Sequence, residues 1–130
     1  MNNQKILVVD DEKDLLHILN LGLRAHGYDV VVATDGLSAV TVAREQKPDL
    51  ILLDIVMPAG DGFTVMDRLA NMVPLAMVPV IVITGTEGLE NMERAEQAGV
   101  KGYLKKPFEM DELLEMIQKT LQTSNAQTAE

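Results

Sequence analysis

The sequence predicts one α/β domain with a flavodoxin-like fold: a doubly wound, parallel sheet of five strands in the order 2-1-3-4-5, with helices on both faces. Two observations support this prediction. Short apolar runs of strand length alternate along the chain with segments whose apolar residues have helical spacing. The apolar runs are also unbroken, which is typical of parallel strands that are buried on both faces. Strict alternation of strand and helix then requires right-handed crossovers.

Five segments have the composition of buried strands. The most apolar are Ile6–Val9, Leu50–Leu53 and Val80–Ile83, which we expect at the centre of the sheet. Val30–Ala33 is a β-branched run, which favours a strand, and Gly102–Leu104 is short enough to suit an edge.

Five further segments carry apolar residues three or four positions apart, the spacing of one helix face. These residues are Leu15, Ile18, Leu19 and Leu23; Leu37, Val40 and Ala43; Phe63, Met66, Leu69 and Ala70; Leu89, Met92 and Ala95; and Met110, Leu113, Leu114, Ile117 and Leu121. Gly27, Pro48 and Gly99 follow the first, second and fourth of these segments, as helix-ending residues do. The sequence therefore predicts five helices.

The composition fits one domain with an aliphatic core. The chain has 130 residues and a mass of 14.2 kDa, which is enough for one domain but leaves no room for a second. Aromatic residues make up only 3% and Trp is absent, so aliphatic side chains and methionine must fill the core. We expect the folded domain to occupy residues 1–121 and the polar residues 122–130 to form a frayed tail.

Cysteine content, charge and hydropathy exclude several classes of function. The absence of Cys excludes disulfides, thiolate metal sites and cysteine nucleophiles. A net charge of −9 disfavours direct binding to nucleic acid, because the phosphate backbone is itself negative. No apolar run approaches the ~20 residues that a membrane span needs, and the first residues lack the features of a signal peptide. We therefore expect a cytoplasmic protein with no membrane partner.

Polar residues follow four of the predicted strands at the point where each strand ends. They are Asp10 with Asp11, Asp54, Thr84 and Lys106. Parallel strands present their carboxyl ends to one crevice, so these side chains should converge there. Three carboxylates at such a distance repel each other and raise their pKa values unless a cation offsets their charge. The crevice is therefore the predicted site.

Magnesium is the cation that best suits this set of residues. It prefers oxygen ligands and keeps several waters, so carboxylates with a backbone carbonyl and a phosphate oxygen suffice. With Mg²⁺ present, a carboxylate can act as a nucleophile toward phosphorus, since phosphoryl transfer requires mainly positioning and neutralisation of charge. Lys106 and Thr84 can supply the remaining contacts.

The ordered motifs resemble the response regulator receiver domain (CheY-like) of two-component signal transduction. The motifs are DD at 10–11, Asp54 within LLDIVMPAGDG, Thr84 with Gly85, and KPF at 106–108. The resemblance covers roughly residues 4–121, and we assign 1–121 to the receiver domain. A DD pair alone is weak evidence, but four ordered motifs that each stand at a strand end are specific.

The resemblance implies a role for each site residue. Asp54 would accept the phosphoryl group, Asp11 would bind the metal directly, and Asp10 would bind it mainly through water. The carbonyl of Val56 would complete the protein's metal contacts. Lys106 would pair with a phosphoryl oxygen.

The resemblance also implies a switch around the phosphoryl group. Thr84 would hydrogen-bond the group and move toward it, and Tyr103 would be the rotating aromatic residue. Ordinary packing of a half-buried tyrosine on an edge strand is the alternative for Tyr103. Ile55 and Gly85 would contribute backbone to the phosphoryl pocket.

The implied function is a phosphorylation-activated signalling switch and not a conventional enzyme, although the domain would catalyse its own phosphorylation and dephosphorylation. Its partners would be a sensor histidine kinase or histidine phosphotransfer domain, and a downstream protein target or effector domain. A small Mg²⁺-dependent phosphatase with an aspartyl-phosphate intermediate is the alternative. Haloacid-dehalogenase-like enzymes of that kind need a second Asp two residues after the nucleophile, where this chain has Val56. That difference disfavours turnover.

Several residues near the site are open to two interpretations. An apolar Val56 cannot orient an attacking water, so we hypothesise a long-lived phosphorylated state. The apolar stretch at 71–78 is either an exposed patch for a partner or the end of a helix folded onto the core. Leu15 could contact the phosphodonor or pack in the core. His17 and His26 are solitary, which is typical of surface histidines.

Overall fold

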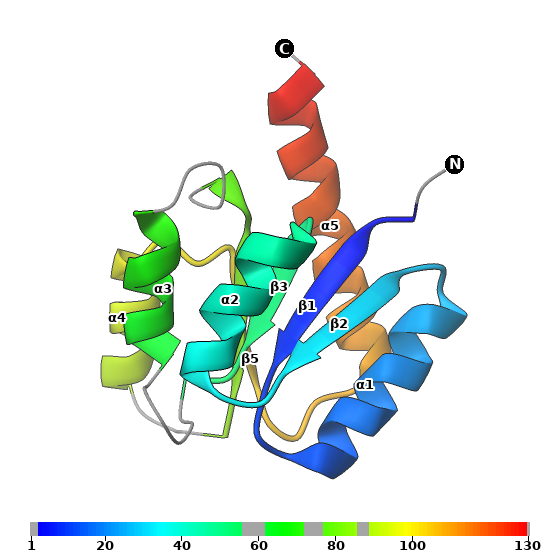
Figure 1. Cartoon of the computed structure of the whole chain (residues 1–130), viewed down its shortest axis with the longest axis horizontal. Coiled ribbons are helices and arrows are strands. Elements are labelled where there is room, and N and C mark those ends of the chain that lie inside the picture. The colour runs from blue at the N-terminus through cyan, green and yellow to red at the C-terminus, as the bar shows by residue number, and fades with distance from the viewer. Residues whose placement is uncertain (1–2, 56–61, 72–76, 86–88, 130) are drawn as a thin grey trace.

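The computed structural model describes residues 3–55, 62–71, 77–85 and 89–129, and in them it confirms the predicted fold. Five parallel strands form one sheet in the order β2-β1-β3-β4-β5, and each is followed by a helix (Figure 1). In chain order the elements are β1 (Lys5–Val9), α1 (Lys13–Ala25), β2 (Asp29–Ala33), α2 (Gly36–Gln46), β3 (Leu50–Leu53), α3 (Gly62–Ala70), β4 (Val80–Thr84), α4 (Leu89–Gln97), β5 (Gly102–Lys105) and α5 (Met110–Ala129).

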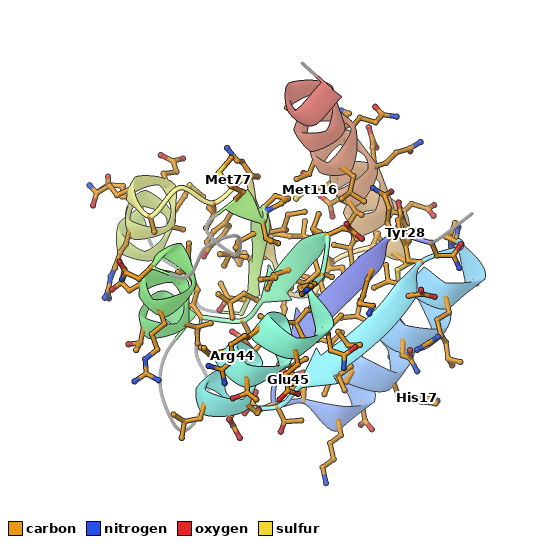
Figure 2. The ribbon with its side chains drawn as sticks, turned by 45° about the horizontal axis from the view of Figure 1, so that its top comes forward. His17, Tyr28, Arg44, Glu45, Met77 and Met116 are labelled. Atoms are coloured by element: carbon orange, nitrogen blue, oxygen red, sulfur yellow. The ribbon has the colours of Figure 1, made fainter. Side chains whose placement is uncertain are left out.

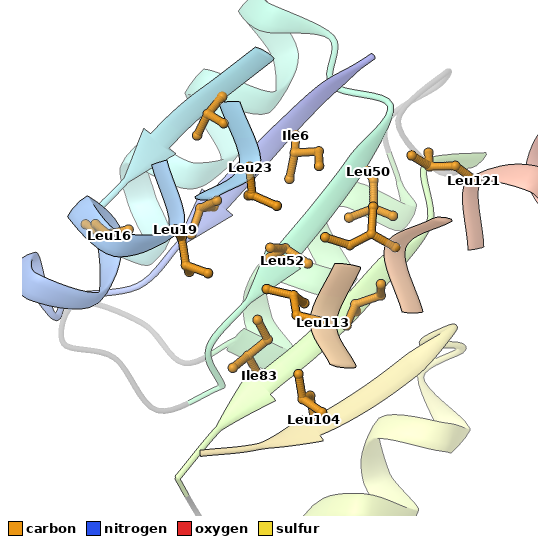
Figure 3. Close-up of a cluster of buried hydrophobic side chains, with 14 residues drawn as sticks. Ile6, Leu16, Leu19, Leu23, Leu50, Leu52, Ile83, Leu104, Leu113 and Leu121 are labelled. Atoms are coloured by element: carbon orange, nitrogen blue, oxygen red, sulfur yellow. The ribbon is translucent and has the colours of Figure 1, made fainter. Parts of the chain in front are cut away.

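The core is divided by the sheet into two apolar layers. Ile6 and Val8 of β1 face α1 and α5, and the intervening Leu7 and Val9 face α2, α3 and α4. Figure 3 shows the layer beneath α1 and α5. Because side chains of a strand alternate between the two faces, a strand covered on both faces must be apolar at every position. This is the physical reason for the unbroken runs in the sequence.

The strand register brings the polar residues to one end of the sheet. Val9 pairs with Leu53, and Leu53 pairs with Val82, so β1 and β3 end at the same level and β4 continues two residues further, to Thr84. Thr84 pairs with Lys105 at the same edge. Asp10, Asp54, Thr84 and Lys106 therefore share one end of the sheet, as the rule for parallel strands predicts.

The buried face of α1 differs from the one expected. Leu16, Leu19 and Leu23 are buried and Leu15 packs partly against them, whereas Ile18 is 55% exposed. Four of the five residues at 15–19 are apolar, so helical spacing alone fits more than one face. The exposure of Ile18 corrects its assignment to the core.

The polar end of the chain is helical as far as Ala129, and the division into a domain at 1–121 and a tail at 122–130 stays a prediction. α5 continues without a break to Ala129, although its last core residue is Leu121. Extending an existing helix costs far less than starting one, and residues 122–129 contain neither Gly nor Pro to stop it. The last turns of α5 project beyond the body of the domain (Figure 1).

The predictions for the apolar stretch at 71–78, for His17 and for membrane spans can be compared with the structure only at the described residues. Residues 72–76 of the apolar stretch at 71–78 lie outside the described residues, and Met77 is 81% exposed (Figure 2). His17 is exposed on α1 (Figure 2). Within the described ranges, no helix combines the length and the apolar content needed to cross a bilayer.

Replacing Lys47 with Gly should stabilise the domain. Lys47 ends α2 in the left-handed conformation, with φ 50° and ψ 62°, and its N–H donates to the carbonyl of Ala43 at 3.1 Å. A side chain is strained there and glycine is not, so we expect a gain of about 0.5–1 kcal/mol in the free energy of unfolding. Urea denaturation measures it. Lys101→Gly, at an exposed site with negative φ, is the control. An equal loss of unfolding free energy in both variants would refute the explanation by backbone conformation.

Candidate functional site

The site lies where β1, β3, β4 and β5 end. Asp10 and Asp54 directly follow β1 and β3, Thr84 is the last residue of β4, and Lys106 directly follows β5. Sheet-like hydrogen bonds continue past the strands: the N–H of Asp54 donates to the carbonyl of Val9 at 2.9 Å, and that of Lys106 donates to the carbonyl of Thr84 at 3.0 Å. The sheet therefore fixes the backbone of each of these residues.

The ammonium of Lys106 is the centre of the site. Its Nζ donates to Asp10 Oδ2 at 2.8 Å, to Asp54 Oδ2 at 3.1 Å and to Glu12 Oε1 at 3.1 Å. An ammonium has three N–H donors, so these three carboxylates use all of them. The side chains of Asp10, Asp54 and Lys106 are only 4%, 6% and 14% exposed, whereas that of Glu12 is 60% exposed.

Charge is not balanced within this cluster. Three ionised carboxylates and one ammonium sum to −3 + 1 = −2. Taking carboxylates out of water without full compensation is costly. A bound divalent cation would neutralise the excess.

The pKa values reflect this imbalance. Burial raises the pKa of Asp10, against the opposing effects of its hydrogen bonds to Lys106 and to the N–H of Glu12. Burial alone would lower the pKa of Lys106, but its hydrogen bonds to Asp10, Asp54 and Glu12 outweigh burial and raise it well above the ordinary value. Lys106 is therefore an ammonium at neutral pH, and burial disfavours the ionised form of Asp10.

Glu12 is a site residue that sequence reasoning missed. Asp10 Oδ1 accepts the N–H of Glu12 at 2.9 Å, which forms a tight turn before α1. Glu12 is the N-cap residue of α1, yet its side chain makes no capping hydrogen bond and reaches Lys106 instead. A third acid directly after the DD pair was the available signal, but an acid at a helix start is ordinarily explained by the helix dipole.

The oxygens brought together fit a hard divalent cation. Asp10, Glu12 and Asp54 each offer one carboxylate oxygen, and these oxygens all lie within 4.8 Å of one another. Asp11, the predicted direct ligand, is exposed and is not in this group, so its ligand role stays a prediction. The predicted carbonyl ligand on Val56 lies outside the described residues.

The structure also places the residues predicted to line the phosphoryl pocket. Thr84 and Ile55 are buried, and Gly85 is exposed. A Cβ at Gly85 would lie 4.0 Å from the Cβ of Lys106, so the absence of a side chain keeps the space beside Lys106 open. Tyr103 pairs with Val82 in the sheet and packs partly against the layer beneath α2, α3 and α4. This position is compatible with both interpretations of Tyr103.

Comparison with known sequences points to one family. The family model of the response regulator receiver domain matches residues 6–118. The DNA-binding dual master transcriptional regulator RpaA of Synechocystis is 33% identical over 93% of this chain and 50% of its own length. The transcriptional regulatory protein PrrA of Mycobacterium bovis is 38% identical over 93% of this chain and 51% of its own length. The chain thus spans about half the length of these curated relatives.

Solved structures agree with the sequence comparison. The CheY-like receiver domain protein of Methanospirillum hungatei superposes with a TM-score of 0.91, at 27% identity, over 97% of this chain and 99% of that one. The receiver domain of a sensor histidine kinase from Pseudomonas aeruginosa has a TM-score of 0.84, at 32% identity, over 92% of this chain and 98% of its own. That structure holds a magnesium ion in its active-site cleft.

Proposed function

Because this chain belongs to the response regulator receiver domain family, we propose that it is a signalling switch in which Asp54 accepts a phosphoryl group with the help of Mg²⁺. Receiver domains are switches of two-component systems and not conventional enzymes. The observation that carries the proposal is the contact of a buried carboxylate, Asp54, with the ammonium of Lys106 at a sheet edge that has two excess negative charges.

We place the metal among the acids at the end of β1 and β3. Asp10, Asp11 and Asp54 would hold it, together with the carbonyl of Val56. When bound, Mg²⁺ supplies positive charge that neutralises the carboxylates and the oxygens of the transferred group. The magnesium site of the Pseudomonas aeruginosa receiver domain supports this assignment.

The chemical step requires one nucleophile and one resident cation from this chain. A carboxylate oxygen of Asp54 attacks the phosphorus of a phosphohistidine, an O–P bond forms, and the P–N bond breaks with its electron pair left on the imidazole. Lys106 remains protonated and donates a hydrogen bond to a phosphoryl oxygen. Because Lys106 already contacts Asp54, it needs no long movement to do so.

Conversion to the active state would begin at β4 and β5. Thr84 is fully buried beside the site, so a hydrogen bond from its hydroxyl to the phosphoryl group would draw the end of β4 inward. Tyr103 lies on the neighbouring strand, where a rotation would alter the surface over β5. Such a change is the expected output of a two-state switch.

Partners are proposed from the family and from the surface beside the site. The phosphodonor would be a histidine kinase or a histidine phosphotransfer domain, docked where α1 leaves the site, near Leu15 and the exposed Ile18. The output would be binding to a protein target or effector domain. The curated relatives are transcriptional regulators about twice as long as this chain, so we assign their DNA binding to the parts of those relatives that the match does not cover.

Incubation with Mg²⁺ and acetyl phosphate, followed by intact mass measurement, tests the proposal. We expect the mass to rise by one phosphoryl group, and we expect EDTA or Asp54→Asn to abolish the rise. Asp14→Asn removes an exposed acid from the first turn of α1 and should leave the rise unchanged. A mass gain that persists in the Asp54→Asn variant would refute the assignment of Asp54.

A further inference from the structure

Glu12 is the one carboxylate around Lys106 that is largely in solvent. Asp10 and Asp54 approach Lys106 from the buried ends of β1 and β3, whereas Glu12 approaches from the start of α1 with 60% of its side chain exposed. Its oxygen nevertheless lies within 4.8 Å of the carboxylate oxygens of both Asp10 and Asp54. Glu12 is thus the solvent-exposed member of the cluster.

The position of Glu12 is fixed by more than its own ion pair. The N–H of Glu12 is bound by Asp10 Oδ1 at 2.9 Å, and its carbonyl accepts the N–H of Leu16 at 3.0 Å as the first turn of α1 begins. The side chain leaves the N-cap position without capping the helix. Its contact with Lys106 therefore replaces the local hydrogen bond that an N-cap side chain ordinarily makes.

We propose that Glu12 is a positioning residue that competes with the phosphoryl group for Lys106, and that its carboxylate leaves Lys106 when Asp54 is phosphorylated. The proposal rests on the function proposed above. Lys106 has no spare N–H donor, so a hydrogen bond to a phosphoryl oxygen requires the loss of one of its three present bonds. Of the three partners, Glu12 is the most exposed and loses least when it returns to water.

Electrostatic repulsion also favours the departure of the Glu12 carboxylate from Lys106. A phosphoryl group bonded to Asp54 would bring its negative oxygens close to Glu12, and like charges at such distances repel. The exposed Glu12 side chain can rotate away from the site, whereas Asp10 and Asp54 are almost fully buried. Displacement of Glu12 would transmit the phosphorylation state of Asp54 to the N-cap of α1.

Beryllofluoride, which binds aspartate as a phosphoryl mimic, gives a binding test that does not depend on turnover. With Mg²⁺ saturating, we expect Glu12→Gln to bind beryllofluoride about threefold to fivefold more tightly than the unmodified protein, since the competing exposed ion pair is gone. Isothermal titration calorimetry measures the affinity, after circular dichroism has verified that each variant is folded.

Asp14→Asn is the matched control, because it removes one exposed acid from the same turn without touching the three partners of Lys106. Its affinity should stay that of the unmodified protein. The proposal would be overturned if Glu12→Gln bound beryllofluoride no more tightly than the unmodified protein. It would also be overturned if Glu12→Gln and Asp14→Asn both bound it more tightly to the same extent, because that result would indicate only a change of local charge. Failure of the unmodified protein to bind beryllofluoride at all would instead count against the proposed function.

Discussion

Replacing Lys106 with Met should destabilise the metal-free protein by about 3 kcal/mol, one of the largest effects expected from any single substitution in this chain. Lys106 is the only cation that contacts Asp10 and Asp54 among the described residues, and both carboxylates are almost fully buried. Removing one partner of a buried ion pair leaves the other charge uncompensated. Protonation of Asp10, whose pKa burial already raises, keeps the loss near the lower end of the usual range.

Urea denaturation with EDTA and with excess Mg²⁺ measures this effect. If charge compensation is the function of Lys106 in the resting protein, Mg²⁺ should restore a large part of the lost stability, because it supplies the missing positive charge. Lys105→Met changes the neighbouring, exposed lysine and should alter stability little. A Lys106→Met protein as stable as the Lys105→Met protein in EDTA would show that the acids do not need this cation.

Asp10→Asn should weaken metal binding at the site and at the same time increase the stability of the metal-free protein. At 100 times its dissociation constant, Mg²⁺ should stabilise the unmodified protein by about 2.7 kcal/mol, and this stabilisation should disappear in the variant when measured at the same concentration. In EDTA at neutral pH the variant should instead be more stable than the unmodified protein, since it removes a buried anion that the fold holds poorly.

The pH dependence gives the same comparison an independent check. The folded-state pKa of Asp10 is raised above its ordinary value of 3.8, so the folded protein binds this proton more tightly than the unfolded chain. The resulting stabilisation is fully present below pH 3.8 and is lost as the pH rises through the folded-state pKa. Chemical denaturation between pH 4 and 7 in EDTA should therefore show a decline that Asp10→Asn lacks. An identical profile in both proteins would contradict the account.

The sheet and the convergence of Asp10, Asp54, Thr84 and Lys106 were predictable because both follow from rules that act locally. An unbroken apolar run specifies a strand covered on both faces, and parallel strands bring their carboxyl ends together whatever residues follow. The polar residue after each run was therefore enough to locate the site. The family resemblance added roles for these residues that spacing alone does not specify.

The buried face of α1, the direction of the Glu12 side chain and the length of α5 could not be predicted from the sequence pattern. Apolar residues at 15, 16, 18 and 19 fit two helix faces, and only the packing of α1 on the sheet decides between Leu16 and Ile18. The direction of the Glu12 side chain depends on the turn that Asp10 Oδ1 forms, which no spacing rule encodes. The length of α5 depends on the propagation of an existing helix, which costs far less than starting one and can continue through polar residues.

The most direct test of the central claim is to locate the phosphoryl group on the chain. Borohydride reduces an aspartyl phosphate to homoserine, and this permanent change can be mapped by peptide mass spectrometry after treatment with Mg²⁺ and acetyl phosphate. We predict homoserine at position 54, none at positions 10 or 11, and no reduction of the Glu12 side chain. Homoserine at position 10 or 11, or a reduced Glu12 side chain, with Asp54 unmodified, would contradict the account.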